Sequence, residues 1–201
     1  MRTTRIYQPG DFSSGEIISL SAAASQHVAR VLRMQIADPL LIFNGKNQQC
    51  HAKIATIDKR TVSVIINQVA ELSVESNLKI HLGQCISKGD KMDLIIQKAV
   101  ELGASSITPI LSQYCNVNID AKRTDKKHRQ WQEQIISACE QSGRNFLPKL
   151  NYPCKLKTFI EQCESKHKFI LHPRNAKPWR EYPNIDDEVS ILIGPEGGLS
   201  D

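Results

Sequence analysis

In the first third of the chain, apolar and polar residues alternate with a period of two in some segments, such as 50–57, and others, such as PLLIF at 39–43, are short apolar runs. Turn-forming sequences at Pro9–Gly10, Asn44–Gly45 and 58–60 separate the apolar runs. This period is typical of strands that bury one face, and such residues between the runs favour turns. The predicted strands are RIY at 5–7, EIISL at 16–20, PLLIF at 39–43, and the segments 50–57 and 61–69. So many short strands close most simply into a small β-barrel.

One helix is predicted to interrupt these strands. Ser21 can cap its first turn, and Val28, Val31 and Leu32 recur at helical spacing, so we expect all three to face the barrel core. The positions on another face carry basic side chains: His27, Arg30 and Arg33.

The pattern changes after residue 72. From Val69 to Leu78 the sequence VAELSVESNL is polar and has no period, which is typical of a linker. We therefore predict two domains, residues 1–72 and residues 73–201.

The second domain alternates strands and helices, which is typical of an α/β fold with a mostly parallel sheet. Strands are predicted at 79–85, 107–111, 168–171 and 189–193, and helices at 90–102, 125–142 and 156–163. The first helix has an apolar face of Met92, Ile95, Ile96 and Ala99. The second has Trp131, Ile135, Ala138 and Cys139. Gly103 and Gly143 can end these two helices.

Composition narrows the class of protein. Of 201 residues, 40% are hydrophobic and 23% are charged. No apolar run reaches the roughly 18 residues that a membrane helix needs, and the N-terminus has no signal-peptide core. We therefore expect a cytoplasmic protein with no membrane partner. The six cysteines form no CxxC pair and have no histidine at ligand spacing, so no metal site is predicted.

Cationic residues concentrate in two places. Residues 1–72 hold eight Lys/Arg against five Asp/Glu, a net charge of +3, and residues 122–129 hold five against one, a net charge of +4. The second group also fits an ordinary solvated helix start. Because the barrel has no aromatic stacking platform, contacts with an RNA backbone are favoured over stacking on bases. The candidate RNA-binding residues are Arg2, Arg5, His27, Arg30, Arg33, Lys88, Lys122 and Arg123.

Three glycines follow the last predicted strand, in the sequence GPEGG at 194–198. Such a turn lets the backbone approach a ligand, and α/β proteins bind ligands at the carboxyl ends of their strands. The turn matches neither the GxGxxG dinucleotide fingerprint nor a Walker loop. It is a candidate ligand-binding loop, with a purely structural turn as the alternative.

Two further segments contain residues that could carry chemistry. Asp93, Gln97 and Glu101 recur every four residues along the helix 90–102, which a solvated helix face also explains. At the end of the helix 125–142, the sequence EQSGR places Arg144 directly after Gly143. An arginine in that position can point into a cleft.

Taken in order, these segments resemble the RsmE family of 16S ribosomal RNA (uracil-N(3))-methyltransferases. The similarity covers the whole chain. It rests on Arg2 with RIY at 5–7, HVARVLR at 27–33, KGDKMD at 88–93, QKAVELG at 97–103, EQSGR at 140–144 and IGPEGG at 193–198.

The resemblance implies a PUA-like β-barrel followed by a SPOUT-type α/β domain with a trefoil knot. It also implies the cofactor S-adenosyl-L-methionine (SAM), a homodimer with its sites at the subunit interface, and methylation of a uridine at N-3. The substrate would be 16S ribosomal RNA or the small ribosomal subunit. The implied cofactor-binding residues are Leu171, His172, Pro173, Ile193, Gly194, Pro195, Glu196, Gly197 and Gly198.

The family continues past the GPEGG loop into a helix and a final knot segment, whereas this sequence ends at Asp201. That segment supplies the third cofactor loop. We therefore expect residues 1–201 alone to hold no SAM, and the loop from Gly194 onward to be mobile.

Methyl transfer to a uracil nitrogen requires removal of the N-3 proton and stabilisation of the developing negative charge. A positioned arginine can stabilise that charge, and Arg144 is the predicted catalytic residue. The arginine of the family's terminal segment is an equal competitor. His27 and His172 are candidate proton acceptors, and a structural role explains either one as well.

Two other functions are considered. A non-catalytic dimeric protein that binds ribosomal RNA would have no cofactor pocket at 194–198. A nucleotide-dependent Rossmann enzyme needs a glycine fingerprint after the first strand, and HLGQC at 81–85 does not contain one.

Overall fold

The computed structural model describes residues 3–112, 121–171, 177–182 and 185–198. Contacts between residues divide the chain into two compact units, each built from two segments that are distant in sequence. The first unit comprises Met1–Glu75 and Cys139–Leu147, and the second comprises Ser76–Ala138 and Pro148–Asp201. The sequence-based boundary after residue 72 assigned 139–147 to the second domain, whereas the contacts assign this segment to the first unit.

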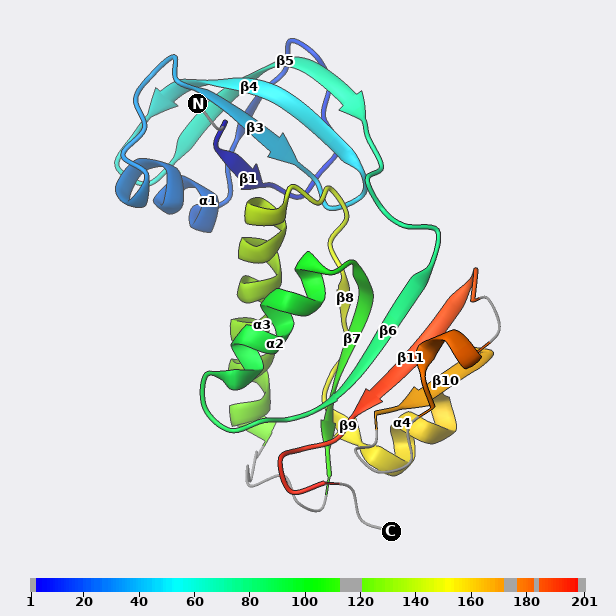
Figure 1. The fold of residues 1–201 in the computed structure, drawn as a ribbon. Coiled ribbons are helices and arrows are strands. Elements are labelled where there is room, and N and C mark those ends of the chain that lie inside the picture. Colours follow the sequence, from blue (N-terminus) through cyan, green and yellow to red (C-terminus); the bar gives the residue numbers. More distant parts are fainter. Residues whose placement is uncertain (1–2, 113–120, 172–176, 183–184, 199–201) are drawn as a thin grey trace. The chain divides into compact units, whose positions relative to one another are not determined.

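A five-stranded sheet forms most of the first unit (Figure 1). In spatial order its strands are β1 (Arg5–Tyr7), β3 (Pro39–Phe43), β4 (Gln48–Ile57), β5 (Val62–Glu71) and β2 (Ile17–Ser19). β1 pairs with β3 in parallel, and the other neighbours are antiparallel. β1 and β2 are the two edge strands of this order. One side-chain hydrogen bond links the segments that follow them: Gln8 Oε1 accepts from Ser21 N (2.8 Å). The predicted strand positions are confirmed, with β4 and β5 extending further than expected.

A short helix follows β2 in the first unit. α1 (Ala22–Gln26) continues directly into the π-helical turn η1 (His27–Val31). The Ser21 hydroxyl accepts a hydrogen bond from Ala24 N (3.2 Å), which confirms the predicted N-cap.

The turn η1 changes which side chains reach the core. Leu32 N donates to His27 O (2.9 Å), five residues back, and this wider turn rotates the residues that follow relative to an α-helix. Val28 is fully buried, whereas Val31 is 64% and Leu32 is 39% exposed. The prediction that all three face the core is therefore wrong for Val31 and Leu32.

The segment Cys139–Leu147 adds an edge to the first unit. Lys46 and Phe146 form an antiparallel bridge, and Leu147 N donates to Gly45 O (3.0 Å). Asn47 N donates to Asn145 O (3.1 Å). These backbone hydrogen bonds join parts of the chain that are about a hundred residues apart in sequence.

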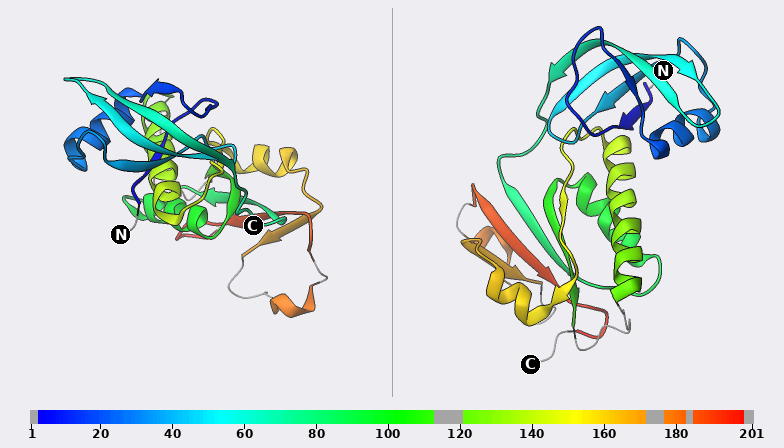
Figure 2. Two further views of the ribbon diagram at one scale, coloured as in Figure 1. Left: turned by 90° about the horizontal axis from the view of Figure 1, so that it is seen from above. Right: turned by 180° about the vertical axis from the view of Figure 1, so that it is seen from behind.

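The second unit is built around a six-stranded sheet whose described pairings are all parallel (Figures 1 and 2). Its strand order is β10 (His167–Ile170), β11 (Glu188–Ile193), β6 (Lys79–Cys85), β7 (Ala104–Leu111) and β8 (Lys149–Leu150), with β9 (Cys154–Lys155) also beside β7. The helices are α2 (Lys91–Glu101), α3 (Ala121–Ser142), α4 (Leu156–Gln162) and the 3₁₀ turn η2 (Trp179–Glu181). Parallel pairing confirms the α/β prediction for this part of the chain.

Helices cover both faces of this sheet. Successive side chains of β6 point to opposite faces, so they contact different helices. Ile80, Leu82 and Gln84 lie on the face that α2 covers. On the other face, the Phe159 ring of α4 packs against His81 and Gly83. Figure 2 shows α2 and α4 on the two sides of the sheet.

The buried faces of the two longer helices are close to those predicted. Trp131, Ile135, Ala138 and Cys139 of α3 are all buried, as are Met92 and Ile96 of α2. Two residues of α2 differ: Ile95 and Ala99 are only half-buried and line a pocket, and Val100 is buried in their place. A helical period places residues on one face, but it does not tell whether that face meets the protein core or an open pocket.

Candidate functional site

A pocket of about 770 Å³ lies in the second unit, at the carboxyl ends of β6 and β11. These strands are more than 100 residues apart in sequence but adjacent in the sheet, with Gln84 paired to Ile193. β6 is followed along the chain by β7 on one side, and β11 lies on the other side, so the sheet extends in both directions from this point. Ligands of α/β proteins bind at such a switch point.

The walls of the pocket are mostly apolar. They come from the end of β6, from α2, from β11 and from the loop after it. Leu102 and Leu171, which are 81% and 61% exposed, both belong to this lining. A contiguous exposed apolar surface of this kind often marks a binding site. A concave apolar surface with a few polar groups is typical of a small-molecule site.

Gln84 supplies a buried polar group to this pocket. The residue is 2% exposed, and its Nε2 donates to Cys85 O (2.8 Å). Within the described part of the chain, no group donates a hydrogen bond to Gln84 Oε1. A buried acceptor without a donor costs free energy, so the pocket is suited to a ligand that brings an N–H or O–H group.

The loop 194–198 forms the rim of the pocket. Gly198 N donates to Pro195 O (2.9 Å), and the positive φ of Gly198 (79°) fits the glycine found there. Glu196 pairs with Lys91 Nζ at the start of α2 (3.0 Å). A backbone N–H and the Lys91 ammonium both lower the pKa of the Glu196 carboxyl. Because both side chains are largely exposed, this ion pair restrains the loop only weakly.

The structure brings five of the predicted cofactor-binding residues together. Leu171, Ile193, Gly194, Pro195 and Glu196 all line the pocket. The rest of the set is Gly197 and Gly198, which belong to the loop without lining the pocket, and His172 and Pro173, which lie outside the described residues.

Sequence reasoning missed the contribution of β6 and α2. The floor residues Ile80, Leu82 and Gln84 alternate along β6, and Ile95 and Ala99 are one helical turn apart. Periodicity is the only signal of these residues in the sequence, and the same periodicity is typical of protein core.

Arg144, the predicted catalytic residue, lies in the first unit and is 6% exposed. Its Nε donates to Glu75 Oε1 (3.1 Å), and its Nη2 pairs with Glu75 Oε2. The buried guanidinium is therefore held in an ion pair with a partly exposed carboxylate. A catalytic role for Arg144 stays a prediction.

The predicted RNA-binding residues have different surroundings. Arg5 is half-buried: its guanidinium lies over the Phe43 ring (4.9 Å to the ring centre) and donates to Asn145 Oδ1 (2.7 Å) and Arg144 O (3.2 Å). The others that the structure describes are exposed or half-exposed: His27, Arg30, Arg33, Lys88 and Arg123. Arg2 and the side chain of Lys122 lie outside the described residues.

The described residues contain no cluster of three or more His, Cys, Asp or Glu that could hold a metal ion. None of their helices is long and apolar enough to span a membrane. The five cysteines among them are free thiols, and burial raises the pKa of Cys139 to about 12, so that thiol is unreactive at neutral pH.

Comparison with known proteins agrees with this arrangement. The sequence family described as RNA methyltransferase domain matches residues 74–201, and the RNA methyltransferase PUA domain matches residues 20–67. Ribosomal RNA small subunit methyltransferase E of Buchnera aphidicola subsp. Schizaphis graminum is 38% identical over 200 residues, which cover 99% of this chain and 81% of that protein. This chain belongs to the ribosomal RNA small subunit methyltransferase E family.

Two solved structures with SAM bound are similar to this chain. A methyltransferase from Legionella pneumophila is 47% identical with a TM-score of 0.98, and the match covers 100% of this chain and 83% of that one. Ribosomal RNA small subunit methyltransferase E from Neisseria gonorrhoeae is 32% identical with a TM-score of 0.94, with the same coverage. Family membership confirms the predicted fold class of a PUA-like domain and an α/β methyltransferase domain. The trefoil knot stays a prediction.

Proposed function

We propose that this protein methylates N-3 of a uridine in 16S ribosomal RNA with SAM as the methyl donor. The main observation that supports this proposal is the apolar pocket over β6 and β11, which is lined by five of the predicted cofactor-binding residues. Relatives of this chain carry the name ribosomal RNA small subunit methyltransferase E, and similar structures contain SAM.

The described residues fit such a cofactor. The pocket of about 770 Å³ lies within the usual range for a ligand of this size. Its apolar walls suit the flat adenine ring, and Gln84 Oε1 offers an acceptor for an amino group. When bound, SAM supplies an electrophilic methyl group on a positively charged sulfur.

The protein contributes mainly alignment and electrostatics. The pocket residues hold the donor in one pose and exclude water from it, so the uridine nitrogen reacts as if it belonged to the same molecule. A cation beside the base would stabilise its deprotonated ring. Arg144 is our candidate for that cation, and the identity of the proton acceptor is open between His27 and His172.

Three finer properties belong to the same proposal. Following the family resemblance, we infer a homodimer, a cytoplasmic location, and either 16S ribosomal RNA or the assembled small subunit as substrate. Light scattering on the purified protein tests the dimer. Parallel reactions with free RNA and with small subunits identify the substrate.

The central test combines SAM binding with analysis of the product. The protein expressed from its complete gene should bind SAM in calorimetry, and nucleosides from treated RNA should contain 3-methyluridine by mass spectrometry. Ala99→Phe places a ring in the pocket and should lower SAM affinity at least about tenfold. Leu94→Phe is the matched control, because Leu94 lies on the same helix, is exposed and does not line the pocket.

A non-catalytic RNA-binding protein is the alternative function, and it requires no SAM affinity. RNA binding without SAM binding would favour it. The same titration on residues 1–201 tests the expectation that these residues alone hold no SAM.

A further inference from the structure

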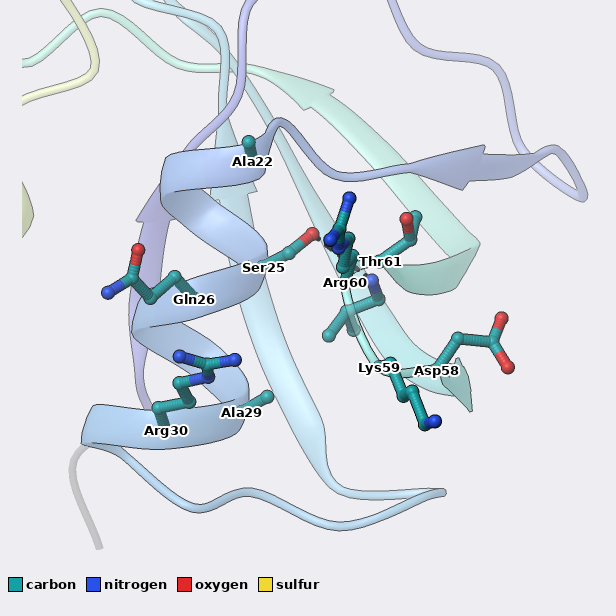
Figure 3. A pocket seen from close by; sticks show the side chains of 10 residues that line it. Ala22, Ser25, Gln26, Ala29, Arg30, Asp58, Lys59, Arg60 and Thr61 are labelled. Carbon is teal, nitrogen blue, oxygen red and sulfur yellow. Dashed lines mark hydrogen bonds between the residues drawn. The ribbon is translucent and has the colours of Figure 1, made fainter.

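A second, smaller pocket lies in the first unit, between the helix α1–η1 and the turn that joins β4 to β5. Its volume is about 220 Å³. Figure 3 shows its lining side chains, which come from one helix face and from residues 58–62. The residues that matter most here are Ala22, Ser25, Ala29, Arg30, Lys59 and Arg60.

Small residues keep this pocket open, and one hydroxyl fixes its width. Ala22 and Ala29 have no side chain that could cross the gap. Ser25 is 2% exposed, and its Oγ donates to Leu20 O (3.2 Å) and accepts from Val62 N (3.1 Å). This buried bridge ties the helix to the start of β5, so residues 58–61 stand at a set distance from the helix.

Three cations surround the opening. Arg30 comes from the helix, and Lys59 and Arg60 come from the turn; all three are exposed. Within the described residues, none of the three forms an ion pair. The lining contains one carboxylate, Asp58; in Figure 3 both Asp58 and the flexible Lys59 side chain extend from the turn on the side away from the helix. Grouped like charges repel one another, so the site favours an anion between them.

The form of the pocket indicates which anion it accepts. Its volume is below the range typical of cofactor sites, and no aromatic side chain lines it, so base stacking is not available. Arginine guanidinium groups bind phosphate oxygens in pairs, and lysine adds a point charge. An RNA backbone phosphate therefore fits better than a base or a free nucleotide.

We infer that this pocket binds a backbone phosphate of the RNA substrate, with Arg30, Lys59 and Arg60 as its contacts. The inference rests on the proposed function in one respect, namely that the substrate is RNA. It assigns Lys59 and Arg60 to the RNA surface.

The test measures RNA affinity against salt concentration, without cofactor. A fragment of 16S ribosomal RNA would be titrated with the full-length protein and with three variants: Arg30→Gln, Lys59→Gln and Arg60→Gln. Each substitution should weaken binding about tenfold, because a charge-assisted hydrogen bond is lost. The three substitutions together should also reduce the slope of log affinity against log salt by about 0.7–0.9 units, the value for one neutralised phosphate, and each alone should remove part of it. The matched control is Lys53→Gln, which removes an exposed cation of β4 outside the pocket.

A second variant tests the pocket itself. Ala29→Leu fills the space without changing the charge, and it should weaken RNA binding as much as Arg60→Gln does. If the three cation variants match Lys53→Gln in affinity and slope, or if the wild-type protein does not bind RNA, the inference is wrong.

Separate readouts distinguish this inference from the proposed function. SAM affinity should be the same in all of these variants, because their positions and the SAM pocket lie in different units. A wild-type protein that methylates RNA while the pocket variants bind RNA normally would refute the phosphate pocket alone. Loss of RNA binding in the variants, with no methyl transfer by the wild type, would refute the enzyme activity alone.

Discussion

Gln84 combines burial with an unused hydrogen-bond acceptor. Several other polar side chains of the second unit pair with one another: Thr108 Oγ1 is within 2.8 Å of both His81 Nε2 and Asn151 Nδ2, and Ser165 Oγ lies 2.8 Å from Ser190 Oγ. Within the described residues of this unit, buried atoms without a partner also occur at Asp93 and Trp131, neither of which lines the pocket. Gln84 Oε1 has no such partner in the described residues, and Gln84 lines the pocket proposed for SAM. We therefore predict that it serves the cofactor rather than the fold.

Replacing Gln84 by methionine should separate these two roles. Methionine keeps the length of the side chain but removes its acceptor and its donor. The free energy of unfolding should change by no more than about 1 kcal/mol, since one hydrogen bond and one unsatisfied acceptor are lost together. SAM affinity should fall about tenfold in calorimetry. Gln97→Met is the control, because Gln97 lies on α2 outside the pocket; equal SAM affinity for both variants would remove Gln84 from the cofactor site.

Arg144 is the residue at which the catalytic and structural explanations differ most. If its ion pair with Glu75 is structural, Glu75→Gln should lower the free energy of unfolding by up to about 3 kcal/mol, because it leaves the buried Arg144 guanidinium without its partner, and Arg144→Gln should cost less because Glu75 is partly exposed. Turnover per folded molecule should then be equal in the two variants. If Arg144 stabilises the uracil anion, only Arg144→Gln should reduce kcat. Denaturant titration and single-turnover kinetics on both variants decide between these explanations.

At the scale of elements, the packing of α4 depends on a glycine in β6. A Cβ built on Gly83 would lie 2.4–2.9 Å from three carbons of the Phe159 ring, which is closer than atoms approach in a folded protein. The absence of a side chain at Gly83 thus allows α4 to pack directly on the sheet, opposite the SAM pocket.

Gly83→Ala should therefore destabilise the second unit by about 1–3 kcal/mol, because Phe159 must move. Phe159→Leu makes room for the new methyl group. The double variant should consequently lose less stability than the sum of the two single variants. Denaturant unfolding of all four proteins measures this coupling, and additive losses would show that the contact between β6 and the Phe159 ring does not limit the packing.

The elements themselves were largely predictable, because periodicity is a local property. The continuous apolar run PLLIF gave the position of β3, the period of two gave that of β4, and the apolar face of α3 was correct at Trp131 and Ile135. The wrong predictions concern the type of helical turn and the surface that a helix face contacts, and neither can be read from the hydrophobic period. The π-helical turn η1 exposes Val31, and the apolar face of α2 meets a pocket at Ile95.

The candidate site was predictable only in part for a related reason. The loop 194–198 has a recognisable sequence, and three of its predicted residues, Gly194, Pro195 and Glu196, line the pocket together with Leu171 and Ile193. The floor on β6 and the phosphate pocket depend on which strands become neighbours and on the space left by Ala22 and Ala29. Strand order and empty space arise from long-range packing, which a single sequence does not show.

At the scale of the whole molecule, the chain enters the first unit twice. After residues 1–75 it forms most of the second unit, returns with Cys139–Leu147, and leaves again. Asn145 connects the returning segment to the barrel. Its side chain accepts from Arg5 (2.7 Å) and donates to Leu72 O (3.0 Å) and to Gln49 Oε1 (3.1 Å).

This arrangement predicts that residues 1–75 alone are an incomplete folding unit. Without Cys139–Leu147, Arg5 and Gln49 lose their Asn145 partner, and the edge at Gly45–Asn47 loses its backbone hydrogen bonds. Joining Cys139–Leu147 to residue 75 through a flexible Gly/Ser linker should raise the free energy of unfolding by about 2–4 kcal/mol, since three or more hydrogen bonds of about 1 kcal/mol each are restored. The same fusion with Asn145→Ala should lose most of that gain, which controls for effects of the linker. Equal denaturation midpoints for residues 1–75 with and without the added segment would instead mean that the barrel is complete in its first segment, as the hydrophobic pattern alone predicts.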